Sequence, residues 1–339
     1  MGYWRAAAAV VCLPAALSLM AFPAAAETVV KIGLINSYTG FVAEAADQAQ
    51  KAIDLYFKEH ERDLPPGVKI ELIRRDDTSN PEVGKRLAQE LITREHVQLL
   101  TGIVLSPVAA AVAPLTAEAK VPLLISIAAA GVAIPRMSPY VARVTVTLWQ
   151  LGYPIGKWAA EQGWKTGYTA VSDFIPGHDS EAAFTKGFTA DGGQMIGTVR
   201  FPPNNPDFAP LGIITSGTYS VAGERPANTA FLAAWKREYA DKAIPNFLSV
   251  DAWDGMAAIF DLIKATKGKF GADEAVAFFR NWKNPDSPRG PIRIDPETRD
   301  IVQNVYIRRL DRQSGRLANI EIATIPMVKD PWKELNPVK

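Results

Sequence analysis

Residues 29–40 of this chain read VVKIGLINSYTG and decide its fold class. Five of the first seven residues are apolar, a near-continuous run that is typical of a parallel strand covered on both faces. A polar loop, Asn36–Gly40, ends the run, and a helical pattern begins at Ala43. Ligands of open α/β sheets bind beyond the carboxyl ends of the strands, so this loop is expected to border a binding site.

The same order of strand, loop and helix recurs through the first half of the chain. Asn80 and Ser106 each precede a proline, which is typical of a helix N-terminus because the first residue caps the helix and proline fits its first turn. The alternation predicts an α/β fold with a parallel sheet and right-handed crossovers. Further strands are expected at residues 69–75, 97–103, 121–127 and 140–144, and helices at 43–60, from 80, from 106 and at 148–162.

A second α/β unit follows, which predicts a second lobe of similar architecture. Its expected elements are a strand at 166–171, a helix at 181–191 and a strand at 195–201. Helices at 227–239, 253–264 and 272–282 are expected after it, with a terminal hairpin of strands 304–309 and 317–325.

A proline-rich joint from Phe201 to Gly212 interrupts this second unit, and the next expected strand covers residues 211–215. A parallel neighbour needs a crossover of about a dozen or more residues that usually contains a helix. The joint is too short and too rich in proline to provide one. Either strand 211–215 pairs in an unusual way, or the second sheet lacks a strand–helix–strand portion.

The N-terminus predicts export of the protein. Arg5 supplies a positive charge, residues 6–22 form an apolar segment, and Ala24-Ala25-Ala26 matches a cleavage site. Together they predict a signal peptide of residues 1–26 that is removed before Glu27. The alternative, a membrane anchor, is disfavoured because the apolar run is short and ends in small residues. The remaining length favours two domains.

Composition excludes several classes of function for the chain after residue 26. Cys12 is the one cysteine, so cleavage leaves neither an internal disulfide nor a thiolate metal site nor a cysteine nucleophile. Removal of Arg5 from the 37 basic residues leaves 36, equal to the 36 acidic residues. A net charge of zero argues against a nucleic-acid partner, which requires a basic face.

Catalytic motifs are missing from the sequence. It contains no G-x-S-x-G elbow, P-loop, G-x-G-x-x-G or H-E-x-x-H motif. His60, His96 and His178 are the three histidines, too few to supply many metal sites or Ser-His triads. We therefore expect a binding protein rather than an enzyme, without catalytic residues, cofactor or metal.

Two pairs of adjacent residues leave alternatives open. His178 followed by Asp179 is either a general base with an orienting carboxylate or part of a helix start that Asp179 or Ser180 caps, and the second interpretation is favoured. Asp76-Asp77 is either a catalytic carboxylate pair or the capped end of a strand. The structural alternative is again favoured, because the sequence offers no second catalytic cluster.

Short motifs in a fixed order run along nearly all of the chain after residue 26. They are Ile32-Gly33, Tyr38-Thr39-Gly40, Asp76, Gly102 with Ser106, Val121-Pro122, Ile125-Ser126, Arg143 with Gln150 and Gly152, Asp173–Gly177, Phe184 and Trp253-Asp254. With these motifs the chain resembles the type I periplasmic substrate-binding proteins of ABC transporters, in the branch typified by leucine/isoleucine/valine-binding proteins.

The resemblance implies two Rossmann-like lobes that are joined by three crossings and close over a ligand. The first lobe would comprise residues 27–141 and 220–300, and the second, shortened lobe residues 142–219 and 301–339. The protein would be a periplasmic monomer that binds a branched-chain or hydrophobic amino acid or a small organic carboxylate. It would then dock on the permease domains of an ABC importer.

The resemblance also implies ligand-binding residues. Ser106 and the loop from Ser126 to Ala130 would hold the ligand carboxylate, with Ala130 in place of the family's usual threonine and backbone groups at Ala128 still able to contribute. The other residues expected in the pocket are Tyr38, Phe174, Pro176 and Tyr219. Each has a structural alternative: Ser106 as a helix cap, Phe174 as a residue of the lobe surface and Tyr219 as a cover of the hinge.

Family members place a helix and a strand at the joint between Phe201 and Gly212, including an acidic partner for the ammonium group of amino-acid ligands. This chain has no such stretch, so the resemblance favours a hydrophobic or aromatic carboxylate over an amino acid. Two alternatives remain: a ligand-sensing relative with an impaired pocket, and an exported hydrolase.

Overall fold

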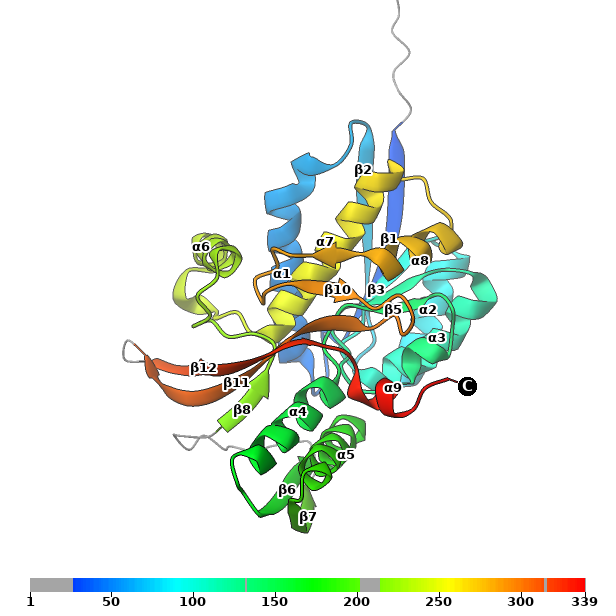
Figure 1. Cartoon of the computed structure of the whole chain (residues 1–339). Coiled ribbons are helices and arrows are strands. Elements are labelled where there is room, and N and C mark those ends of the chain that lie inside the picture. Colours follow the sequence, from blue (N-terminus) through cyan, green and yellow to red (C-terminus); the bar gives the residue numbers. More distant parts are fainter. Residues whose placement is uncertain (1–26, 132, 202–213, 314–315, 339) are drawn as a thin grey trace, which may run out of the picture.

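The computed structural model describes residues 27–131, 133–201, 214–313 and 316–338. The expected signal peptide, residues 1–26, and most of the joint between Phe201 and Gly212 lie outside the described residues. Figure 1 shows the main body of the fold above a smaller unit drawn in green. Within the described part of the chain, no helix combines the length and apolar character needed to cross a bilayer.

The main body is built on a five-stranded sheet in which every neighbouring pair is parallel. Its strand order is β2-β1-β3-β4-β5, with the bounds β1 Thr28–Asn36, β2 Val68–Asp76, β3 Leu99–Gly102, β4 Leu123–Ile125 and β5 Val141–Arg143. Ile32 and Leu34 of β1 are completely buried. The strand pairings confirm the predicted parallel sheet, and Ile35 on the opposite face of β1 is also completely buried, as expected of a strand covered on both faces.

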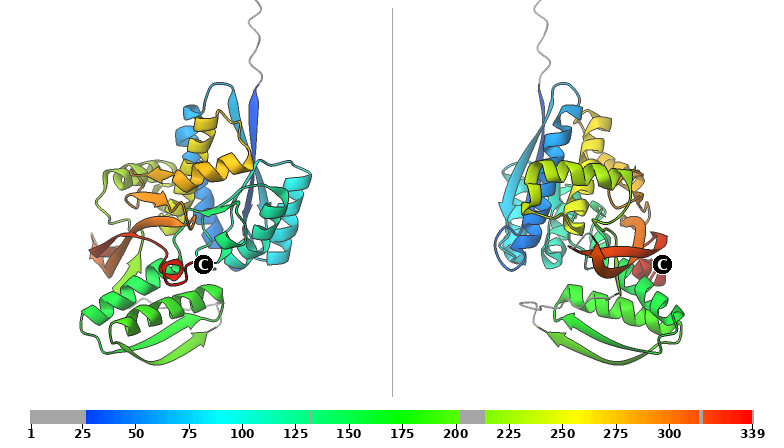
Figure 2. Two further views of the ribbon diagram at one scale, coloured as in Figure 1. Left: turned by 45° about the vertical axis from the view of Figure 1, so that its right-hand side comes forward. Right: turned by 90° about the vertical axis from the view of Figure 1, so that its left-hand side faces the viewer.

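Helices cover both faces of this sheet (Figure 2). On one face, α1 (Ala43–His60) and α7 (Phe247–Thr266) pack in a core with Ile32 and Leu34. On the other, α2 (Pro81–Thr93) and α3 (Ser106–Ala119) pack with Ile35. At Gly33, a Cβ atom would lie 2.7 Å from Leu100 Cδ2. The absence of a side chain at this position therefore allows close packing in the core between the sheet and the helices α2 and α3.

The helix starts confirm one capping prediction and correct a second, and one helix begins earlier than predicted. The Asn80 side chain accepts hydrogen bonds from the backbone of Glu82 and Val83, as predicted. Leu105, not Ser106, is the N-cap residue of α3, and its side chain makes no capping bond. α7 begins at Phe247, six residues before the predicted start, because the preceding asparagine forms a capping box there.

The smaller unit contains α4 (Leu148–Glu161), β6 (Thr166–Ser172), α5 (Ile175–Ala190) and β7 (Gln194–Phe201). β6 and β7 form a separate parallel pair. Both helices lie on one side of this pair in Figure 2. On the strands, Tyr168, Ile196 and Val199 are 58%, 62% and 45% exposed, so this unit carries an apolar surface that a doubly wound fold would normally bury.

α5 begins six residues before the predicted helix at 181–191. Phe174 is its N-cap residue and a proline follows at the first turn, which is a favourable place for proline. His178, Asp179 and Ser180 therefore lie inside the helix, and the interpretation of Asp179 or Ser180 as its cap is wrong.

A third, antiparallel sheet joins distant parts of the chain. Its order is β12-β11-β10-β9, and β8 pairs with β11. The bounds are β8 Ile214–Gly217, β9 Lys283–Asn284, β10 Ile292–Ile294, β11 Ile301–Gln313 and β12 Arg316–Val328. The terminal hairpin is confirmed and is longer than predicted. The strand expected at 211–215 pairs in an unusual way, which was the first of the two alternatives. It is β8, and it runs antiparallel to β11 instead of extending the β6–β7 pair.

The remaining helices lie around these sheets. α6 (Pro226–Tyr239) and α8 (Ala272–Asn281) match predicted helices, and α9 (Pro331–Leu335) was not predicted. Short 3₁₀ turns cover Glu61–Asp63, Ile134–Arg136 and Ala240–Lys242. β10 pairs with β11 across residue 300, so the third sheet continues through the point where the resemblance divides the lobes.

Replacement of Phe260 by alanine tests the α1–α7 core. The ring is completely buried and lies 5.1 Å from the Tyr56 ring and 5.2 Å from the Phe57 ring. The change should lower the free energy of unfolding by about 3–5 kcal/mol through lost contacts and a cavity, measured by urea denaturation. Val29→Ala, at a side chain that is 43% exposed, is the control, and equal losses in both variants would contradict the assignment of this core.

Candidate functional site

Several of the residues predicted to bind a ligand follow the strands at one edge of the parallel sheet. Tyr38 follows β1, Ser106 follows β3, and Ser126 follows β4. The carboxyl ends of parallel strands meet at the same edge, so the fold brings these loops together. This edge is the candidate site.

The loop after β4 is held against the start of α3. The Ser106 hydroxyl oxygen accepts a hydrogen bond of 3.1 Å from the backbone N–H of Ala130. The Ser126 hydroxyl donates to the carbonyl of Gly102 at 3.3 Å. Both serines are buried, as are Ala128 and Ala130. The structure therefore brings four of the eight predicted residues together, and Ser106 acts as an acceptor for the loop rather than as a helix cap.

The side chain of Arg143 holds this loop by hydrogen bonds, a role that the sequence did not reveal. It is completely buried, and its Nη2 donates to the carbonyls of Gly131 at 3.1 Å and Ala130 at 3.4 Å. Its Nε lies 3.7 Å from a carboxylate oxygen of Asp300. Among the described residues, Nε and Nη1 have no hydrogen-bond partner. An arginine at the end of an apolar strand was the available signal, since buried arginine is rare without a role.

A hydrogen bond links this loop to the smaller unit. The N–H of Gly131 donates to the carboxylate of Asp179 in α5 at 2.9 Å. Burial raises the pKa of Asp179, while the bond from Gly131 and the charge of Arg143 act in the opposite direction. Phe174 and Pro176, at the start of the same helix, are half-buried. The start of α5 therefore faces the loop after β4.

The disfavoured alternative, in which Asp179 orients His178 as a general base, is wrong. The Nε2 atom of His178 lies 2.8 Å from a carboxylate oxygen of Asp173, whereas Asp179 bonds the loop across from it. Neither arrangement is that of a base and its orienting group, because the two side chains bond different partners. Within the described ranges, no group of three or more His, Cys, Asp or Glu residues is arranged to hold a metal ion.

The acidic pair after β2 caps its own loop. Asp76 accepts hydrogen bonds from the Thr39 hydroxyl at 2.7 Å and the Thr78 N–H at 2.9 Å. Asp77 accepts from the Ser37 hydroxyl at 2.6 Å. These bonds hold the loops after β1 and β2 against each other. The pair therefore caps the end of a strand, as favoured from the sequence, rather than forming a catalytic carboxylate pair.

Tyr38 and Tyr219 occupy different environments. The Tyr38 hydroxyl donates to Gln50 in α1 at 2.5 Å, and burial raises the pKa of Tyr38 to about 12. Tyr219 is 3% exposed and packs in the core with Phe231, at a ring separation of 6.4 Å. Its hydroxyl has no partner among the described residues. Tyr219 therefore lies in the core near the crossing rather than with the loop after β4.

A buried ionic cluster lies beside Arg143. Asp300 precedes β11, and Lys333 of α9 bonds its carboxylate. Asp330, the N-cap residue of α9, accepts from the Trp332 N–H at 2.9 Å. Burial and then repulsion by Asp300 raise the pKa of Asp330 to about 6. The cluster links α9 to the end of β5 and to the start of β11.

Gly131→Ala tests the geometry of the loop. Gly131 has a φ of +72°, and an added Cβ would lie 2.6 Å from Ile134 Cδ1. A left-handed backbone costs an alanine about 1–2 kcal/mol, and the contact adds to that cost. Gly163→Ala is the matched control, because its φ is +85° with nothing within 4 Å. We expect a larger loss of stability in urea for Gly131→Ala, and equal losses would contradict a tightly held loop.

Asp330→Asn tests the ionic cluster through pH. The raised pKa means that the folded state binds a proton more tightly than the unfolded state, so this contribution to stability is complete below pH 4 and is lost as the pH rises through about 6. The variant keeps a good capping residue but lacks the titration. The melting temperature of the wild type should therefore fall relative to that of the variant between pH 4.5 and 7.5. If the melting temperatures of the two proteins change with pH in parallel, the assignment of a raised pKa to Asp330 is contradicted. Carboxyls whose pKa values are lowered, such as those of Asp76 and Asp295, are present in both proteins and affect them alike.

Comparisons with known proteins agree on one family. The model of the periplasmic binding protein family matches residues 29–213 and 211–316. Leu/Ile/Val-binding protein homolog 6 of Brucella abortus is 32% identical over 375 aligned positions, which cover 92% of this chain and 95% of the relative.

Two solved structures are similar over most of their length. One is a solute-binding protein of an ABC transporter from Rhodopseudomonas palustris BisB5 in complex with 3,4-dihydroxybenzoic acid, with 37% identity, a TM-score of 0.85 and coverage of 91% of this chain and 100% of that one. The other is a solute-binding protein from R. palustris in complex with 4-hydroxybenzoate, with 33% identity, a TM-score of 0.82 and coverage of 89% and 98%.

The match to the family model is interrupted near the joint after β7. The two stretches matched by the family model meet at residues 211–213, at the end of the proline-rich joint. The alignment with the Brucella protein spans 375 positions, more than the 339 residues of this chain, so some positions have no residue here. These findings agree with the unusual strand pairing of β8.

Proposed function

The chain belongs to the periplasmic binding protein family, and from this premise we propose that it is the solute-binding component of an ABC importer and captures an aromatic carboxylate. The observation that carries the proposal is the 37% identity, over 91% of this chain, with a solute-binding protein that holds 3,4-dihydroxybenzoic acid. The second R. palustris protein, in complex with 4-hydroxybenzoate, supports the same class of ligand.

The candidate site has donors suited to a carboxylate. The Ser106 hydroxyl accepts one bond from the loop and retains its own proton for another acceptor. α3 begins at this edge and the first turns of α5 face the loop after β4, and the partial positive charge of helix N-termini favours an anion. The buried guanidinium of Arg143 lies behind the loop, where it donates to the carbonyls of Ala130 and Gly131 and faces the carboxylate of Asp300. An aromatic acid needs these donors and a hydrophobic wall, without a partner for an ammonium group.

We assign ligand contact to seven of the predicted residues. They are Tyr38, Ser106, Ser126, Ala128, Ala130, Phe174 and Pro176, which come from both units of the fold. Closure of the two lobes would move the start of α5 against the loop after β4, and the bond between Gly131 and Asp179 would hold that contact. Tyr219 is left out because its side chain is buried in the core.

The wider role follows from the family. We propose that the signal peptide is cleaved after Ala26 and that the mature chain acts in the periplasm as a monomer. Its two lobes would comprise residues 27–141 with 220–300 and residues 142–219 with 301–339. The closed form of the protein would then bind a permease. The protein would be a carrier rather than an enzyme, and no residue is assigned a catalytic role.

Titration of the mature chain, residues 27–339, tests the proposal. 3,4-Dihydroxybenzoate, 4-hydroxybenzoate and benzoate are compared with leucine by calorimetry and thermal melting. A ligand at 100 times its dissociation constant stabilises the folded state by about 2.7 kcal/mol, so a clear rise in melting temperature is expected with the aromatic acids. A rise with leucine alone, or with no compound, would contradict the proposal.

Ser106→Ala tests the carboxylate contact. Loss of a hydrogen bond to a charged group is worth about 1.5–3 kcal/mol, so the dissociation constant of the preferred aromatic acid should rise about tenfold or more. Thr189→Ala, which removes an exposed hydroxyl from the far end of α5, is the control and should bind as the wild type does. Unchanged binding in Ser106→Ala would exclude this serine from the site.

A further inference from the structure

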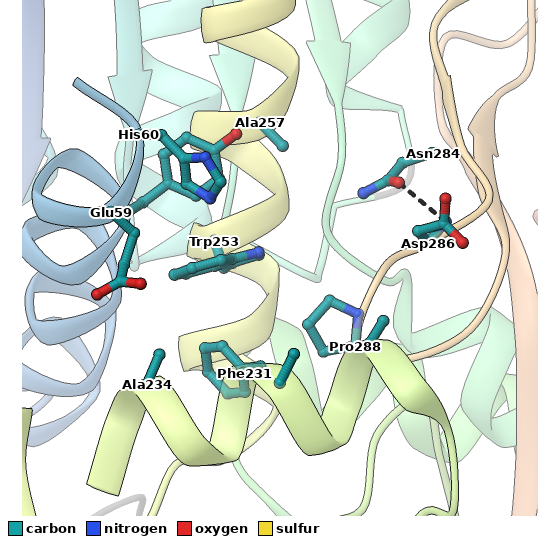
Figure 3. Close-up of a pocket in the computed structure, with 12 residues that line it drawn as sticks. Glu59, His60, Phe231, Ala234, Trp253, Ala257, Asn284, Asp286 and Pro288 are labelled. Carbon is teal, nitrogen blue, oxygen red and sulfur yellow. Dashed lines mark hydrogen bonds between the residues drawn. The ribbon is translucent and has the colours of Figure 1, made fainter. Parts of the chain in front are cut away.

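A cavity of about 460 Å³ lies outside the candidate site (Figure 3). It is formed by the end of α1, by α6, by the middle of α7 and by the segment between β9 and β10. We call it the α1–α6 cavity, and its lining includes Glu59, His60, Phe231, Trp253, Asn284 and Asp286.

Aromatic rings dominate this cavity. Trp253 is half-buried and lies between His60 and Phe231 in Figure 3. Its ring centroid is 5.1 Å from that of Phe231, 4.7 Å from that of Tyr56 and 5.6 Å from that of His60, with planes inclined by 72–74°. Aromatic faces carry negative partial charge and attract cations, with tryptophan the most effective.

Trp253 differs from two other tryptophans, Trp235 and Trp282, in the hydrogen bonding of its indole N–H. The indole N–H groups of Trp235 and Trp282 donate to Ala243 and Asp261 at 3.0 Å. Within the described part of the chain, the N–H of Trp253 has no such acceptor, and in Figure 3 its nitrogen points toward the side of Asn284 and Pro288. The indole edge is therefore available to a molecule in the cavity.

The charge at the rim of the cavity is negative. Glu59 is neutralised by Arg237, which donates to both of its carboxylate oxygens at 2.9 Å. Asp286 is exposed and, among the described residues, its carboxylate forms no ion pair. It lies across the cavity from His60 in Figure 3. An anionic ligand would be repelled by this carboxylate, whereas a cation would be attracted.

We propose that the α1–α6 cavity binds a small organic cation of the ammonium class, with its apolar body against Trp253 and Phe231 and its charge balanced by Asp286. The cavity is separate from the site of the aromatic acid. Tyr38 precedes the start of α1, whereas the cavity lies at its end, and the 18 residues of this helix span about 27 Å. The inference is independent of the proposed function.

The test compares choline with its neutral isostere, 3,3-dimethylbutan-1-ol, which has the same shape without the charge. Binding to the mature chain is measured by calorimetry and by tryptophan fluorescence at millimolar concentrations. Choline should bind about tenfold or more tightly than the isostere, because the attraction of the rings and of Asp286 acts on the charge alone. Equal binding of the two compounds, or no binding of choline, would overturn the proposal.

Two variants locate the site. Trp253→Leu should abolish choline binding and Asp286→Asn should weaken it several-fold, whereas Trp164→Leu and Glu118→Gln, at exposed positions elsewhere, should leave it unchanged. Asp286 is exposed, so its variant tests the charge even if Trp253→Leu fails to fold. Unchanged choline binding in Asp286→Asn would overturn the role of this carboxylate.

A competition experiment tests whether choline and the aromatic acid bind at different sites. Choline is titrated in the presence of saturating 3,4-dihydroxybenzoate and in its absence. Equal affinities support a separate site, whereas competition between the two compounds would overturn it. If the protein binds no aromatic acid, choline binding is still measured directly, so failure of the proposed function and failure of this inference give different results.

Discussion

The arrangement of the candidate site depends on one buried charge, the guanidinium of Arg143. A buried charge is costly unless polar groups surround it, so the carbonyls of Ala130 and Gly131 turn toward it. Because the peptide between these two residues is planar and trans, its N–H points the opposite way, toward Asp179. Arg143 thus orients the donor that joins the two units, and Asp300 connects the same charge to the start of β11.

Local patterns were sufficient to predict much of the main body. The apolar run of β1 indicated a strand covered on both faces, and the asparagine before Pro81 indicated the start of α2. The resemblance to a known family placed Ser106, Ser126, Ala128 and Ala130 in one site, and the structure holds the loop after β4 against Ser106 at the start of α3. These features depend on residues that are close in sequence or on the edge shared by parallel strands.

Features that depend on distant residues were not predictable from local pattern. The early starts of α5 and α7 are local features that the apolar periodicity did not show: α5 begins just before Pro176, and α7 begins at the capping box of Asn246. Asp300, Asp330 and Lys333 lie more than 150 residues after Arg143 in the sequence and come near it only in the folded chain. The length of the joint after β7 indicated an unusual strand, but its partner, β11, lies about 90 residues further along the chain.

This separation has a consequence for the order in which the protein folds. β6, α5 and β7 are consecutive and make local contacts, as do the first strands and helices of the main body. The pairing of β8 with β11 must instead close a loop that contains α6, α7 and α8, and contacts of long sequence separation form slowly because chain entropy opposes them. Docking of the terminal hairpin would then be a late step, and nascent chains that still lack it would expose the edge of β8 to pairing with other molecules.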